Sequence, residues 1–149
     1  MSFVLVVDDA ADVRVLCREV LSRAGHEVVT VASGEEALTF LDRAARLPDL
    51  VLLDIVMPVM DGWEVLDAIR ASPDTQRLRV VMFSVKSQRR DRIAGFQRGC
   101  DGYVSKPFNL DLWLREIEDV LARHEAERTQ HRAATLRDLI GAGSTLDDL

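Results

Sequence analysis

The chain has 149 residues, of which 48% are hydrophobic and 30% are charged, and this composition fits one globular domain with room for an appended segment. Its 19 basic and 25 acidic residues give a net charge of −6, which disfavours direct binding to nucleic acid or to anionic membranes. The first residues, MSFVLVVDD, contain no cationic leader, so neither a signal peptide nor a membrane span is expected and a cytoplasmic location is predicted.

Short apolar runs alternate along the chain with segments whose apolar residues recur every three or four positions. The runs predict strands, at residues 3–7, 26–31, 50–53, 79–84 and 101–105. The periodic segments predict a helix after each strand. Such alternation favours a parallel sheet with right-handed crossovers and helices on both faces. The expected fold class is therefore α/β, a three-layer doubly wound sandwich around a five-stranded parallel sheet.

Capping residues mark several expected helix ends. Ser33 followed by Glu36 is typical of a capping box, and Asp61 and Asn109 are expected to cap two later helices. The helix predicted over residues 87–98 should stop at Gly99. The last helix is expected to bury a stripe made of Leu110, Leu114, Ile117 and Leu121. Of the two tryptophans, Trp63 is expected to pack inside the protein, whereas Trp113 is interpreted as a contact for a partner.

Polar residues end most of the predicted strands. Asp8 and Asp9 follow the first strand, Asp54 follows the third, Ser84 ends the fourth and Lys106 follows the fifth. The carboxyl ends of parallel strands meet at one edge of a sheet, so these side chains are expected to line one cleft. Clustered carboxylates need a cation, and oxygen ligands with room for water suit Mg²⁺. A carboxylate beside Mg²⁺ can attack a phosphoryl group, and Asp54, which ends its strand singly, is the expected nucleophile.

Four motifs carry a family resemblance. They are VLVVDD at residues 4–9, LLDIVMPVMDG at 52–62, FSVK at 83–86 and GYVSKPF at 102–108. In this order they resemble the receiver domain of two-component response regulators, over residues 1–123. The resemblance implies a flavodoxin-like sheet of order 2-1-3-4-5. It also implies a single-domain response regulator, a phosphoprotein of phosphorelay signal transduction that is not an enzyme beyond its own phosphorylation and dephosphorylation.

The implied mechanism is a switch. A sensor histidine kinase or phosphotransfer protein would donate a phosphoryl group to Asp54, and the resulting aspartyl phosphate would change the binding of a downstream protein through the fourth helix, fifth strand and fifth helix. By the resemblance, Mg²⁺ is held by Asp8, Asp9, Asp54 and the backbone carbonyl of Val56. The phosphoryl contact and switch residues would be Ser84, Tyr103 and Lys106, and the position of a cis-proline is taken by Pro107.

One departure concerns the lifetime of the phosphoryl group. Positions that influence this lifetime in the family are occupied here by Val56, Val85 and Lys86. Receivers usually have alanine or another small residue where this chain has Val85. The larger side chain is expected to narrow access to Asp54, and Lys86 could pair with the phosphoryl group. A long-lived phosphorylated form is therefore a hypothesis.

Two other functions stay open on the sequence alone. A Mg²⁺-dependent phosphohydrolase of the haloacid dehalogenase type also uses an aspartyl nucleophile, but that class carries two aspartates one residue apart after its first strand, whereas Asp8 and Asp9 are adjacent. A receiver-like scaffold that binds constitutively would need no phosphorylation. Taken singly, each carboxylate could be a helix cap or a loop acid. Their combination with Lys106 and Pro107 favours the switch.

Residues 124–149 are too few for a separate output domain. Residues 122–132 favour helix but offer only alanines for burial, which predicts a solvated helical extension or a flexible, partly disordered tail. A small apolar patch follows, made of Ala133, Leu136, Leu139 and Ile140. This patch would either dock on the domain or meet a partner, and a homodimer through the last helix or the tail is one such contact.

Overall fold

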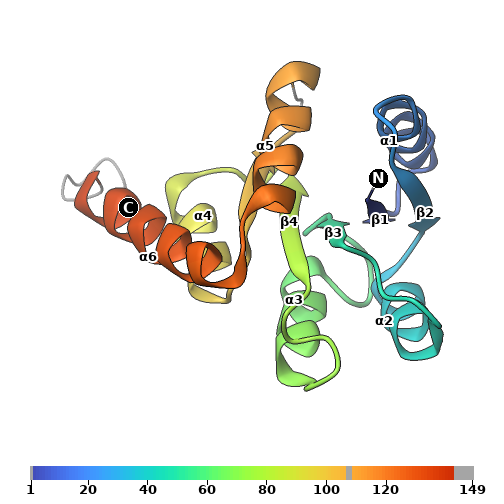
Figure 1. Cartoon of the computed structure of the whole chain (residues 1–149), viewed down its shortest axis with the longest axis horizontal. Coiled ribbons are helices and arrows are strands. Elements are labelled where there is room, and N and C mark those ends of the chain that lie inside the picture. Colours follow the sequence, from blue (N-terminus) through green and yellow to red (C-terminus); the bar gives the residue numbers. More distant parts are fainter. Residues whose placement is uncertain (1, 107–108, 143–149) are drawn as a thin grey trace.

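Strands and helices alternate along the chain in the computed structural model, which describes residues 2–106 and 109–142 (Figure 1). The first half contains β1 (Phe3–Val7), α1 (Ala11–Arg23), β2 (Glu27–Val31), α2 (Gly34–Arg43), β3 (Leu50–Leu53) and α3 (Gly62–Ala71). The second half contains β4 (Arg79–Ser84), α4 (Arg89–Gln97), β5 (Gly102–Ser105), α5 (Leu110–Ala122) and α6 (Glu125–Ala142). The sheet is parallel with the order β2-β1-β3-β4-β5, which confirms the predicted fold class and strand order.

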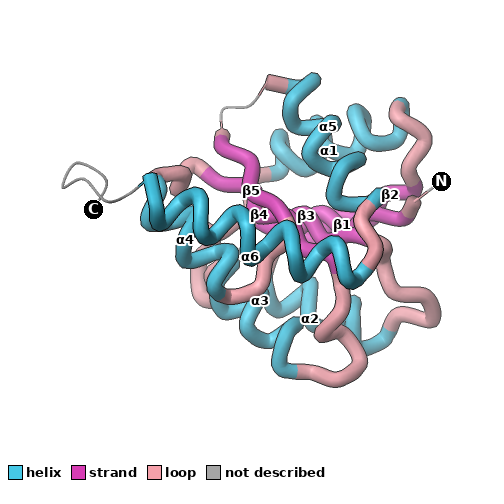
Figure 2. The backbone as a smooth tube through the Cα atoms, turned by 60° about the vertical axis from the view of Figure 1, so that its left-hand side comes forward, coloured by secondary structure: helices cyan, strands magenta, loops and turns pink. Residues whose placement is uncertain are grey.

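The sheet is buried on both faces because successive side chains of a strand point to opposite sides. Leu5, Val51 and Met82 face a cluster with residues of α2, α3 and α4. Val4, Leu52 and Phe83 face a second cluster with residues of α1 and α5. Figure 2 shows the strands between these two groups of helices. The near-continuous apolar runs seen in the sequence are thus explained by burial on two sides.

The predicted helix caps are present. The hydroxyl of Ser33 accepts a hydrogen bond from the backbone N–H of Glu36 at 3.1 Å, and the Asp61 carboxylate accepts one from the N–H of Glu64 at 3.0 Å. Asn109 caps α5 in the same manner. These caps satisfy N–H groups that have no partner within the helix.

The buried stripe of α5 differs from the prediction. Its fully buried residues are Trp113, Ile117 and Val120; the predicted Leu114 and Leu121 are partly buried against the same cluster, whereas Leu110 is 44% exposed. Trp113 is fully buried, with its ring centroid 5.9 Å from that of Phe83, so its interpretation as a partner contact was wrong. Two overlapping helical stripes share Ile117, and the one that contains the large indole removes more apolar surface from water. Trp63 is half-buried and packs against the core, as expected.

The C-terminal segment also differs from the solvated extension that its alanines suggested. α5 ends at Ala122, and α6 begins at Glu125 as a separate helix that packs on α4 (Figures 1 and 2). Leu136 and Leu139 pack against the core cluster, whereas Ile140 is 53% exposed. This helix docks through buried polar contacts made by arginine side chains. A count of apolar residues such as alanine does not register these contacts.

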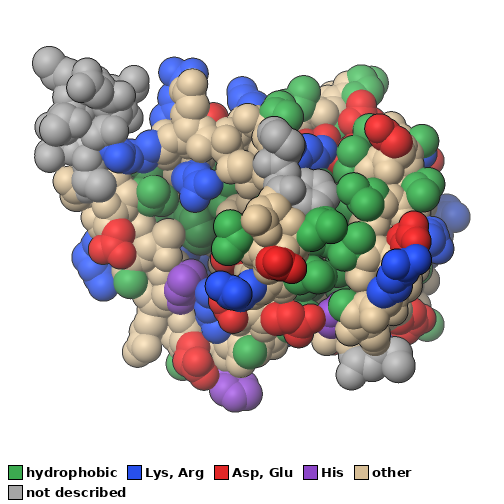
Figure 3. All heavy atoms as spheres, turned by 90° about the horizontal axis from the view of Figure 1, so that it is seen from above, with side chains coloured by type: hydrophobic (Ala, Val, Ile, Leu, Met, Phe, Trp, Pro, Cys, Tyr) green, Lys and Arg blue, Asp and Glu red, His purple; other side chains and the backbone are tan. Residues whose placement is uncertain are grey.

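The side of the molecule that carries α1 and α5 has a mixed surface. When the molecule is seen from above relative to the view of Figure 1, hydrophobic side chains lie among acidic and basic ones (Figure 3). The exposed hydrophobic residues of α1 and α5 are Val15, Leu16, Leu110 and Leu112. Within residues 2–106 and 109–142, no helix is both long and apolar enough to cross a membrane.

Candidate functional site

Three carboxylates meet at the carboxyl ends of β1 and β3. These strands are neighbours, with Val7 opposite Leu53, so Asp8 and Asp54 leave the sheet side by side. Asp8, Asp9 and Asp54 each place one carboxylate oxygen within 4.8 Å of the others. Asp8 is fully buried, Asp54 is 5% exposed, and Asp9 is exposed. The structure therefore brings together the acidic residues that the sequence assigned to one cleft.

The charges at this site are unbalanced. Burial raises the pKa of Asp54, and the nearby Asp8 raises it further, whereas Lys106 and the N–H groups of Val56 and Ile55 lower it. Lys106 places its Nζ 2.5 Å from Asp8 Oδ2 and 3.5 Å from Asp54 Oδ2. Among the described residues, the Lys106 ammonium thus pairs with two of the three carboxylates, Asp8 and Asp54. The pKa of Asp54 stays raised in spite of it, which indicates room for further positive charge.

The donor set fits a hard divalent cation. All three side chains offer oxygen, and the exposure of Asp9 leaves space for water, which Mg²⁺ retains in most protein sites. The backbone amide of Val56 donates to Asp54 Oδ1 at 3.3 Å, so the Asp54 carboxylate is oriented by its own loop. Within residues 2–106 and 109–142, Asp54, Asp8 and Asp9 are therefore the group that could hold a metal ion.

Two residues that sequence reasoning missed position the acidic side chains. A Cβ atom at Gly62 would lie 2.2 Å from the backbone oxygen of Asp54, so only glycine lets α3 begin against the strand end. The N–H of Gly62 donates to the carbonyl of Ile55 at 2.8 Å. Arg14, on α1, donates to the carbonyl of Asp8 at 2.8 Å. The Asp61-Gly62 pair at the end of the LLDIVMPVMDG motif was the signal in the sequence that could have identified Gly62. No signal in the sequence identified the role of Arg14.

Two of the predicted switch residues, Ser84 at the end of β4 and Tyr103 on β5, connect through Lys86. The buried Ser84 accepts a hydrogen bond at its Oγ from the N–H of Lys86 at 3.2 Å, and the Tyr103 hydroxyl donates to the carbonyl of Lys86. Among the described residues, Ser84 Oγ thus bonds to Lys86, not to Asp54. Val85 is 63% exposed and Val56 is 52% exposed, so both face solvent. Pro107 lies outside the described residues.

Comparison with known proteins places this geometry in a family. Residues 4–118 match the model described as the response regulator receiver domain. The chain is 35% identical over 124 residues to the phosphate regulon transcriptional regulatory protein PhoB of Rhizobium meliloti, covering 83% of this chain and 54% of the relative. It is 35% identical over 132 residues to the transcriptional regulatory protein CpxR of Escherichia coli, covering 88% and 54%. The chain spans about half the length of these curated relatives.

Solved structures give the same result. Chemotaxis protein CheY4 of Vibrio cholerae superposes with a TM-score of 0.74 at 32% identity, covering 80% of this chain and 98% of that one. The signal receiver domain of a signal transduction histidine kinase from Syntrophus aciditrophicus has a TM-score of 0.74 at 26% identity, covering 84% and 96%. Because the family model spans residues 4–118 of 149 and the sheet order and acidic cluster agree with it, the chain belongs to the family of response regulator receiver domains.

Proposed function

We propose that this protein is a phosphorylation-dependent signalling switch in which Asp54 accepts a phosphoryl group from a histidine kinase or phosphotransfer protein. Receiver domains in general interact with such proteins, bind Mg²⁺ and are signalling modules rather than enzymes. The observation that carries the proposal is the meeting of the buried Asp54 with Asp8, Asp9 and the Lys106 ammonium at one sheet edge. The switching unit is residues 1–123, and α6 is an accessory helix rather than an output domain.

The chemistry is a transfer of one phosphoryl group. An oxygen of Asp54 forms a bond to phosphorus while the bond from phosphorus to the donor nitrogen breaks, and the electron pair leaves with the donor imidazole. Asp8, Asp9, Asp54 and the carbonyl of Val56 would hold Mg²⁺. When bound, the metal neutralises charge on the phosphoryl oxygens.

Lys106 and Ser84 adjust to the new group. The Lys106 ammonium lies 3.5 Å from Asp54, so it reaches a phosphoryl oxygen by exchanging its contact with Asp8. Ser84 turns its hydroxyl from the N–H of Lys86 to the phosphoryl group. Because the Tyr103 hydroxyl bonds to the carbonyl of the same Lys86, the change passes to β5. The lifetime of the phosphoryl group is set in part by Val56, Val85 and Lys86.

The partner-binding face is formed by α4, β5 and α5. A groove of about 470 Å³ crosses these three elements, and its lining includes Arg92, Tyr103, Leu112, Arg115 and Glu116. Burial raises the pKa of Glu116, with the charge of Arg123 opposing this rise. Tyr103 lies both in this groove and in the chain of contacts to Ser84, which supports communication between the two. The partner is a downstream protein or a second copy of the chain, and direct nucleic acid binding by this segment is not part of the proposal.

Mass spectrometry of the intact protein tests the proposal. The protein is incubated with Mg²⁺ and a small phosphodonor such as acetyl phosphate, and the mass of one phosphoryl group is expected on wild type but not on Asp54→Asn. Lys106→Ala should form the adduct more slowly. Rapid turnover of unrelated phosphate esters would support the phosphohydrolase instead, and the absence of an adduct with every donor would support the constitutive scaffold.

A further inference from the structure

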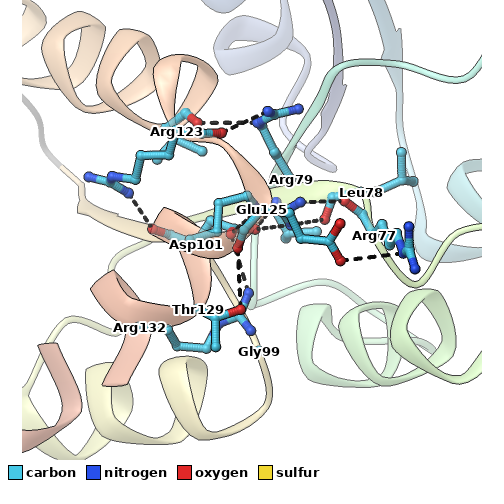
Figure 4. A network of polar contacts seen from close by, with 12 residues as sticks. Arg77, Leu78, Arg79, Gly99, Asp101, Arg123, Glu125, Thr129 and Arg132 are labelled. Carbon is cyan, nitrogen blue, oxygen red and sulfur yellow. Dashed lines mark hydrogen bonds and ion pairs between the residues drawn. The ribbon is translucent and has the colours of Figure 1, made fainter. Parts of the chain in front are cut away.

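A buried carboxylate outside the phosphoryl site anchors α6 to the domain (Figure 4). Asp101 is 2% exposed and directly precedes β5. Its carboxylate accepts hydrogen bonds from Arg128 at 2.8 and 3.2 Å, from Arg132 at 3.2 Å and from Arg70 of α3 at 3.1 Å. Two of these arginines, Arg128 and Arg132, lie one helical turn apart on α6, so one face of this helix grips a single acidic residue.

Backbone carbonyls complete the anchor. Arg128 also donates to the carbonyls of Arg77 at 2.8 Å and Leu78 at 3.2 Å, just before β4, and Arg132 donates to that of Cys100 at 3.2 Å. The Arg128 side chain is 8% exposed. Burial alone would raise the pKa of Asp101, but the hydrogen bonds from Arg128 and the N–H of Val80 lower it below its ordinary value, so the carboxylate is charged in the anchor. α6 is therefore docked by specific, satisfied contacts.

The anchor is continuous with the elements that carry the switch residues. Asp101 is two residues before Tyr103, and the ring of Tyr103 packs so tightly against Gly95 of α4 that a Cβ there would lie 3.3 Å from the ring. α4 also packs against α6. Beyond the other end of β4, the carbonyl of Lys86 accepts a hydrogen bond from Tyr103, and beyond the other end of β5, Lys106 bonds to Asp8. β5 is thus tied to α6 through Asp101 at its start and to the phosphoryl site through Lys106 at its end, and both Tyr103 and α6 contact α4.

We propose that α6 is an autoinhibitory latch, whose docking on Asp101 and α4 stabilises the arrangement in which Lys106 pairs with Asp8 and Tyr103 with Lys86. The two sets of contacts occur together in one arrangement of α4 and β5, so each stabilises the other. A phosphoryl group on Asp54 withdraws Lys106 and Ser84 from this arrangement, and it therefore acts against the latch. Coupling of this kind is reciprocal: a weaker latch favours occupancy of the phosphoryl site, and occupancy loosens α6. The latch rests on the proposed function of Asp54.

The test uses the full chain with Mg²⁺ and beryllium fluoride, a mimic of the phosphoryl group. The latch is weakened by Arg132→Ala and separately by Leu136→Ala, and the matched control is Arg137→Ala at an exposed position of α6. Both latch variants are expected to bind beryllium fluoride at least about fivefold more tightly than wild type and the control. In wild type, beryllium fluoride is expected to speed amide hydrogen exchange in α6.

Each other result has a defined meaning. The latch is overturned if the latch variants and the control bind beryllium fluoride with equal affinity. It is also overturned if amide exchange in α6 is unchanged while the loop after Asp54 becomes protected. In either case α6 only stabilises the structure. The exchange experiment needs no variant, so it decides the matter even where a substitution unfolds the protein. If beryllium fluoride protects no part of wild type, including the loop after Asp54, the proposed function fails and the latch fails with it.

Discussion

Val59 lies in the loop between β3 and α3 with a φ of 68° and is 92% exposed. A β-branched residue in the left-handed region is strained by roughly 1–2 kcal/mol, because its Cβ crowds the following carbonyl. Asp54 lies at one end of this loop and Gly62 lies at the other. The strain therefore sits in a segment that frames the phosphoryl site.

Relief of this strain should stabilise the protein. Val59→Asn, which tolerates the left-handed region, is expected to raise the free energy of unfolding by about 1 kcal/mol, measured by urea denaturation in the presence of a chelator. Val15→Asn is the control, because Val15 is 65% exposed within α1 and the two residue types have similar helix propensities. Equal effects of the two substitutions would show that Val59 is not strained.

Val85 follows Ser84 directly and is 63% exposed, so its side chain stands on the solvent side of the site. It should slow the approach of water to an aspartyl phosphate. The phosphoryl group is expected to be long-lived on wild type and to decay several-fold faster on Val85→Ala, measured by intact mass after removal of the donor. Equal and rapid decay of both proteins would refute this role.

At the scale of elements, α5 joins the domain through a deeper side chain than its leucines suggest. Trp113 is fully buried against Phe83 of β4, whereas its neighbour Leu112 is 60% exposed. Trp113→Ala is expected to cost about 3–5 kcal/mol of unfolding free energy through lost burial and a residual cavity. Leu112→Ala should cost less than about 0.5 kcal/mol. Similar losses of unfolding free energy for the two variants, measured by urea denaturation, would contradict the observed burial of Trp113 and exposure of Leu112.

The anchor of α6 should be sensitive to acid. Because the pKa of Asp101 is lowered in the folded protein, its pairing stabilises the fold above the ordinary carboxyl pKa of about 4, and this contribution is lost as pH falls through the lowered value. Asp101→Asn is expected to cost about 3 kcal/mol at pH 7, since it leaves the charge of the buried Arg128 without its carboxylate partner. The stabilities of the two proteins should converge below pH 4. Curves that stay parallel from pH 7 to pH 3 would contradict the charged anchor.

The elements differ in how far sequence alone determines them. The strands, the Ser33, Asp61 and Asn109 caps and the acidic cluster follow from local pattern and from the rule that parallel strands end together. The docking of α6 does not, because burial of Arg128 depends on Asp101, a carboxylate 27 positions away. The face of α5 that is most deeply buried was mispredicted, because two stripes of apolar residues share Ile117. Only packing against the sheet selects between these stripes.

At the scale of the whole molecule, two apolar clusters on opposite faces of one parallel sheet leave its carboxyl edge for polar chemistry. The three carboxylates and Lys106 lie at this edge, whereas the α6 anchor lies at the amino ends of β4 and β5. The two polar sites are connected through α4, through the length of the last strands, and through α3, which begins beside Asp54 and carries Arg70 to Asp101. The proposed latch therefore predicts that a change of charge at one edge affects a helix at the other through elements that pack in the core.

The most direct test of Asp54 as the phosphoryl acceptor is to locate the phosphoryl group in the chain. After incubation with Mg²⁺ and acetyl phosphate, borohydride converts an aspartyl phosphate to homoserine, and trypsin then releases residues 47–70, which contain Asp54, and residues 1–14, which contain Asp8 and Asp9. Homoserine is expected at position 54 with Mg²⁺, and none is expected when a chelator replaces the metal. Homoserine at position 8 or 9, or modification of Asp54 that is independent of Mg²⁺, would contradict this expectation.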